Sequence, residues 1–154
     1  LMNTHQPVLL KSLTIIKPNF HAFTARFHGK LVESDITMGY LTAAQFNERS
    51  YTLYCVLERI IKNLDNPSSV APFLSHHITF LKNVHIQQVD IKILCDAFYS
   101  TLEEHLGRLF SVESQLAWQK VLRFFTNFAN NILFNVSNVV SLKQQIEKKT
   151  NSET

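Results

Sequence analysis

The chain has 154 residues, 45% of them hydrophobic and 18% charged, a balance that excludes a disordered chain and fits one globular domain. With only 3 Gly and 4 Pro, turn residues are too few for a sheet-rich fold, so we expect long helices. The net charge of +3 is too small and too dispersed for a nucleic-acid-binding surface, which needs a dense basic stripe.

The first predicted helix covers residues 6–17 and ends at Pro18, whose ring cannot continue an α-helix. A second helix follows, because its apolar side chains recur every three or four residues and share one face: Phe20, Phe23, Phe27 and Leu31. Thr42 and Gln45 have the spacing of a capping box, so we expect a long third helix over residues 42–64.

A fourth helix is predicted after the break at residues 66–68, with Ser69 as its cap and Pro72 in its first turn. It carries Phe73, His77, Phe80, Leu81 and Val84. Asp90 has the character of a cap for the fifth helix, which Gly107 ends. The apolar face of the fifth helix is Ile91, Leu94, Phe98 and Leu102.

The last helix is predicted from Ser111 to about Lys148, longer than a domain core of this size can bury. Its apolar stripe continues past the part that the core can cover, which indicates an interface. We therefore expect a homodimer or a signalling partner at this C-terminal helix. The domain covers residues 1–150, and the polar residues 151–154 form a frayed tail.

The order and spacing of these segments resemble the flavohaemoglobin-type and single-domain bacterial globins. The resemblance rests on residues 23–31, which read FTARFHGKL, on residues 72–86, and on the pattern from Ile91 to Trp118. It covers roughly residues 8–140 and implies a single all-α domain. The implied fold is globin-like, with six to seven helices and an extended C-terminal helix.

The resemblance implies a haem pocket in which a histidine of the fourth helix binds the iron, and at that position this chain has Leu81. Leucine has no lone pair to donate, so it cannot replace imidazole as an axial ligand. We therefore expect neither a cofactor nor a bound metal. The alternative is haem with atypical ligation of the iron by His77, His85 or His28.

The resemblance also assigns the other side of the pocket. His28 stands where related globins have a tyrosine, Arg49 where they have a distal glutamine or histidine, and Leu53 one turn further as an apolar wall. Tyr40 corresponds to the aromatic residue of the bend, and Phe98 completes the expected pocket. Arg49 has two interpretations: a solvated helix residue, or a buried cation that requires an anionic partner.

These residues indicate a sensor, regulatory or ligand-binding domain that takes a small apolar or anionic ligand, and not an enzyme. The sequence has no nucleophile elbow, glycine-rich phosphate loop or paired catalytic carboxylates. The alternatives are a haem protein that binds O2, NO or CO, and a structural module whose 12 Phe fill the pocket. No apolar run approaches the roughly 18 residues of a membrane span, and we expect a cytoplasmic protein.

Overall fold

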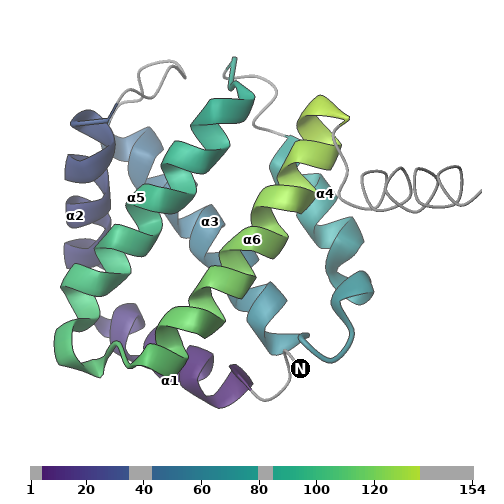
Figure 1. Ribbon diagram of the computed structural model, residues 1–154. Coiled ribbons are helices and arrows are strands. Elements are labelled where there is room, and N and C mark those ends of the chain that lie inside the picture. The colour runs from purple at the N-terminus through teal and green to yellow at the C-terminus, as the bar shows by residue number, and fades with distance from the viewer. Residues whose placement is uncertain (1–4, 35–42, 80–84, 136–154) are drawn as a thin grey trace, which may run out of the picture.

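A computed structural model describes residues 5–34, 43–79 and 85–135, and this part of the chain contains helices and no strand (Figure 1). The α-helices are α1 (Gln6–Ile16), α2 (Phe20–Val32), α3 (Ala43–Lys62), α4 (Ala71–Thr79), α5 (Gln88–Leu106) and α6 (Val112–Phe134). Three short 3-10 turns join them: η2 (Lys17–Asn19), η3 (Pro67–Val70) and η5 (Gly107–Leu109). The all-α prediction is therefore confirmed.

The boundaries of α5 and α6 test the caps and helix ends that the sequence predicts. The last helix begins where it was predicted, and Ser111 is its N-cap, because its side chain accepts a hydrogen bond from the Ser114 N–H at 3.1 Å. Gly107 ends α5 at a positive φ of 53°, a conformation that costs glycine little. The prediction for Asp90 is wrong by one turn: Gln87 is the N-cap, and the Asp90 carboxylate accepts the Gln87 N–H at 2.7 Å.

Two further boundaries differ from the sequence pattern. Ser69 does not cap α4, because it lies inside the η3 turn, where its hydroxyl donates to the Asn66 carbonyl. The last helix ends at Phe134 rather than near Lys148, because Asn135 adopts a left-handed conformation with φ of 57°. Asparagine tolerates this conformation better than most residues and so commonly ends helices. Residues 136–154 lie outside the described part of the chain.

Each α-helix packs against at least two others. α1 crosses α3, α5 and α6, and it forms the base of the molecule in Figure 1. α2 packs against α5 and α3, whereas α4 packs against α3 and α6 on the far side. The apolar stripes predicted for these segments meet in one core, in which Leu57, Leu74 and Ile91 have no exposed surface.

An aromatic cluster lies at the centre of this core. The Phe98 ring of α5 contacts Phe23 and Phe27 of α2 at centroid distances of 5.2 and 5.5 Å, in edge-on geometry. On its other side, Phe98 contacts Trp118 of α6 at 5.9 Å. Such pairs add roughly 0.5–1.5 kcal/mol each beyond the burial of apolar surface. The cluster therefore joins α2, α5 and α6.

Two buried hydroxyl groups lie where α2 and α3 meet. Ring contacts mark this crossing at both ends: Phe20 with Tyr54 at 5.3 Å and Phe27 with Phe46 at 5.6 Å. Thr24 is one turn from Phe20 on α2, and Ser50 is one turn from Phe46 on α3. Both hydroxyls are buried and have no hydrogen-bond partner among the described residues. A buried unpaired hydroxyl costs roughly 1–3 kcal/mol, so this crossing is less stable than it could be.

A matched pair of threonines tests this cost. Thr24→Val is expected to raise the free energy of unfolding by about 1 kcal/mol, because it removes an unpaired buried hydroxyl without changing the volume. Thr101→Val should lower the free energy of unfolding by about 1 kcal/mol, because the buried Thr101 hydroxyl donates to the Ala97 carbonyl at 2.7 Å. Urea unfolding of both variants measures the difference. Equal destabilisation by the two substitutions would show that the Thr24 hydroxyl has a partner.

Candidate functional site

His28, the predicted pocket residue of α2, packs against the first turns of α3. His28 is half-buried, and its ring packs on Phe46 of α3 at a centroid distance of 4.4 Å and an angle of 42°. The neighbouring Phe27 contacts the same Phe46 ring. This contact therefore holds the His28 imidazole against an aromatic side chain that the sequence analysis did not assign to the site.

Leu53 and Arg49 follow Phe46 along α3 and have different surroundings. Leu53 is half-buried and packs against the core, as expected of an apolar wall. Arg49 is exposed, which agrees with the interpretation of a solvated helix residue. No described contact joins Arg49 to His28, so the anion-recognising entrance stays a prediction.

His77 lies on α4 beside a second aromatic ring. It is half-buried, and its imidazole packs on Phe73, one turn earlier, at a centroid distance of 4.5 Å. Arg59 of α3 places its guanidinium carbon 4.1 Å from the centre of the same Phe73 ring. Burial lowers the pKa of His77 below its usual 6.5, and the charges of His76 and Arg59 lower it further. His77 is therefore neutral at neutral pH, the form in which imidazole binds metals.

The remaining site residues separate into three groups. His85 is exposed in the turn before α5, where its backbone has a positive φ of 52°. Phe98 is buried in the aromatic cluster of the core, and its contribution to a pocket stays a prediction. Leu81 and Tyr40 lie outside the described residues.

The contact between Arg59 and Phe73 was missed by sequence reasoning. Arg59 had no special feature on α3, and Phe73 was assigned only to an apolar face. The spacing of Phe73 and His77 by four residues was visible, but the approach of Arg59 from another helix is a tertiary contact that spacing cannot reveal.

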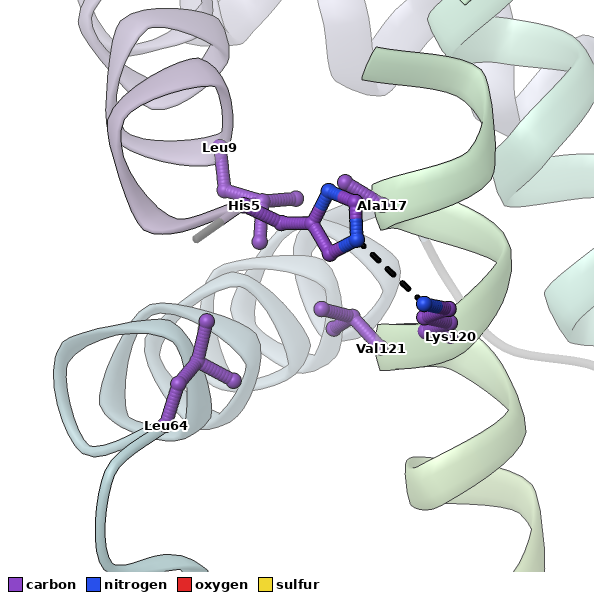
Figure 2. Close-up of a pocket in the computed structure, with 6 residues that line it drawn as sticks. All are labelled: His5, Leu9, Leu64, Ala117, Lys120 and Val121. Carbon is purple, nitrogen blue, oxygen red and sulfur yellow. Dashed lines mark hydrogen bonds between the residues drawn. The ribbon is translucent and has the colours of Figure 1, made fainter. Parts of the chain in front are cut away.

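A shallow depression lies elsewhere, between the start of α1 and the middle of α6 (Figure 2). It has a volume of about 140 Å³ that includes open solvent, and its lining residues are His5, Leu9, Leu64, Ala117, Lys120 and Val121. The Lys120 ammonium donates to His5 Nε2 at 3.3 Å. None of the predicted site residues lines it.

No group of three or more His, Cys, Asp or Glu side chains in the described segments is arranged to hold a metal ion. None of the described helices is long and apolar enough to cross a membrane.

The family model of the globins matches residues 42–130, from the start of α3 to near the end of α6. The match covers more than half of the chain. This protein is a member of the globin family. The resemblance to globins is therefore confirmed, and the helices described above are the globin fold.

Haem is the cofactor that this family implies, and its iron needs a nitrogen or sulfur donor. Among the described residues, α4 offers the imidazoles of His76 and His77 to such an iron. His77 lies on α4, but its ring packs on Phe73, and one turn further along the sequence stands Leu81. A leucine gives no electron pair to a metal. Under the resemblance, in which Leu81 takes the position of the iron ligand, the usual bond between histidine and iron is not expected.

Proposed function

We propose that this chain is a globin-fold sensor, regulatory or ligand-binding domain that works without the usual histidine ligation of haem. One feature of the sequence carries the proposal: the chain has Leu81 at the position to which the resemblance assigns the iron ligand. The globin-family match supports it, because that match assigns the chain a fold in which this position matters.

The surroundings of His28 and His85, two of the three alternative iron ligands, also favour a function without histidine-ligated haem. The His28 ring packs on Phe46, and a move toward an iron atom would give up that contact. His85 is exposed in a turn, so ligation would require it to leave solvent. An axial bond through either residue needs a rearrangement of side chain or backbone.

The proposed ligand is a small apolar acid or another anion in the pocket expected beside Leu53, which supplies an apolar wall on α3. The proposed output is a homodimer or a signalling partner that contacts the last helix. We place the protein in the cytoplasm and assign it no catalytic step, because its sequence contains no recognisable catalytic motif.

A second candidate function is a haem protein that binds O2, NO or CO and whose iron is held by His77. The observation that favours it is the lowered pKa of His77, which keeps this half-buried imidazole neutral at neutral pH. Ligation would require the ring to leave Phe73, on which it packs.

An absorption spectrum separates the two candidates. Protein purified after expression with added haem is expected to show no Soret band at stoichiometric intensity, because Leu81 cannot ligate iron. Leu81→His should bind haem more tightly than the natural chain and give a Soret band of clearly higher intensity. A full Soret band from the unmodified protein would reject the proposed function.

If the unmodified protein does bind haem, alanine variants identify the ligand. His77→Ala is expected to abolish the spectrum under the second candidate function, whereas His85→Ala and His28→Ala should leave it intact. The measurement is the Soret position and intensity of each variant at equal protein concentration. Retention of the full spectrum by all three variants would exclude every ligand that we have named.

Titration with a fluorescent fatty acid tests the proposed ligand class. We expect saturable binding with about one site per chain, because a single pocket in the family fold takes the apolar tail. Leu53→Lys should weaken binding at least about tenfold, since a charge in an apolar wall is strongly disfavoured. Leu109→Lys is the matched control, because Leu109 is 57% exposed on η5. Equal binding by both variants would show that the probe does not contact the wall at Leu53.

A further inference from the structure

Exposed apolar side chains gather at the corner between α5 and α6. Six large apolar residues of the described chain are well exposed, and three of them lie within eight residues of one another: Leu109 at 57%, Val112 at 72% and Leu116 at 50%. Val112 and Leu116 are four residues apart on α6, so they share one side of that helix. Leu109 lies on η5, at most about 11 Å from Val112 along the chain. These three side chains, which we call the corner patch, therefore form one surface.

Hydrogen bonds and a ring contact hold the backbone that carries the corner patch. The Phe110 N–H donates to the Gly107 carbonyl at 3.1 Å, and the Gln115 side chain donates to the Phe110 carbonyl at 3.1 Å. The Phe110 ring is buried and contacts Tyr99 of α5 at a centroid distance of 5.5 Å. Because this backbone is already fixed, little conformational entropy is lost when another surface covers the patch.

Two opposite charges flank the corner patch. Arg108 precedes Leu109 and Glu113 follows Val112, and both charged side chains are exposed. The ion pairs among the described residues join other groups, and neither Arg108 nor Glu113 belongs to one of them. The patch and its two flanking charges are therefore neutral together, although the whole chain has a net charge of +3. A surface with one cation and one anion beside an apolar centre is complementary to itself.

We propose that the corner patch is the contact surface of a homodimer with two-fold symmetry. In such a contact both copies use the same surface, so each Arg108 faces Glu113 of the second copy while the apolar side chains pack at the centre. A strongly charged partner of another kind would leave Arg108 or Glu113 beside a like charge, which is costly. The inference rests on the proposed output, a homodimer or signalling partner at the last helix, and names the part of that helix that makes the contact.

The size of the patch determines how strong this dimer is. Three apolar side chains with two flanking charges cover much less than the roughly 800 Å² per partner that a stable complex buries. We therefore expect a weak dimer, with a dissociation constant of about 100 μM. Sedimentation equilibrium of the full chain between about 10 μM and about 1 mM should show the average mass rising from that of a monomer toward that of a dimer.

A matched pair of valines tests the surface. Val112→Lys is expected to weaken dimerisation at least about tenfold, because it places a charge at the apolar centre of the contact. Val32→Lys is the control and should leave dimerisation unchanged. Val32 is 69% exposed and is the last residue of α2, which ends at the opposite side of the molecule from the corner between α5 and α6 (Figure 1).

Charge reversal tests whether the partner is a second copy. Arg108→Glu and Glu113→Arg should each weaken dimerisation, because each variant places like charges opposite one another. An equimolar mixture of the two variants should dimerise more strongly than either variant alone, since both charge contacts between the two different copies are again attractive. A mixture that dimerises no better than its components would overturn the two-fold pairing.

The outcomes separate the corner patch from the proposed function. A chain that stays monomeric at about 1 mM, or a dimer that Val112→Lys does not weaken, overturns the corner patch. Val140→Lys tests the apolar stripe predicted beyond Asn135. Loss of the dimer with Val140→Lys but not with Val112→Lys would overturn the corner patch and keep the proposed output at the last helix. A full Soret band would reject the proposed function without changing the sedimentation result.

Discussion

The packing of Phe98 between Phe23, Phe27 and Trp118 is the contact on which the rest of this structure depends. It joins α2 to α5 and α6, two consecutive helices that lie far from α2 in the sequence. Through Phe27, which also contacts Phe46 near the start of α3, the cluster connects α2 to α3 as well. The position of His28 therefore follows from the aromatic core rather than from any contact with a ligand. Removal of the Phe98 ring would disturb the candidate site as well as the core.

The other side of the fold is held more weakly. α4 has 9 residues, and an isolated helix of that length is unstable in water. It depends on the burial of Leu74 and Ile78 and on the contact of Phe73 with Arg59 of α3. In a globin of the usual kind, a bond between histidine and iron would add a further attachment next to this helix. The contact between Arg59 and Phe73 attaches α4 to α3 without any such bond.

Helix boundaries were predicted well where a single residue determines the backbone conformation or the hydrogen bonding at the helix end. Ser111 and Gly107 are such cases, because an N-cap hydroxyl and a positive φ are properties of the single residue. Asp90 shows where such prediction fails. Gln87 and Asp90, three positions apart, form the capping box together, and the sequence alone does not say which of the two is the N-cap. The end of α6 was missed for a similar reason. The apolar stripe continues past Asn135, and the backbone conformation of Asn135 ends the helix in spite of it.

The candidate site was less predictable than the helices, and Arg49 and Arg59 show why. Both lie on α3, and both are exposed. The family resemblance drew attention to Arg49 because of its position in the expected pocket. The structure gives Arg59 the defined aromatic contact instead, because α4 approaches α3 near its C-terminal end. Helical periodicity assigns a residue to a face, but it does not say which part of another helix covers that face. The chemistry of this globin is therefore better judged from contacts between helices than from position alone, and one such contact joins Arg59 of α3 to Phe73 of α4.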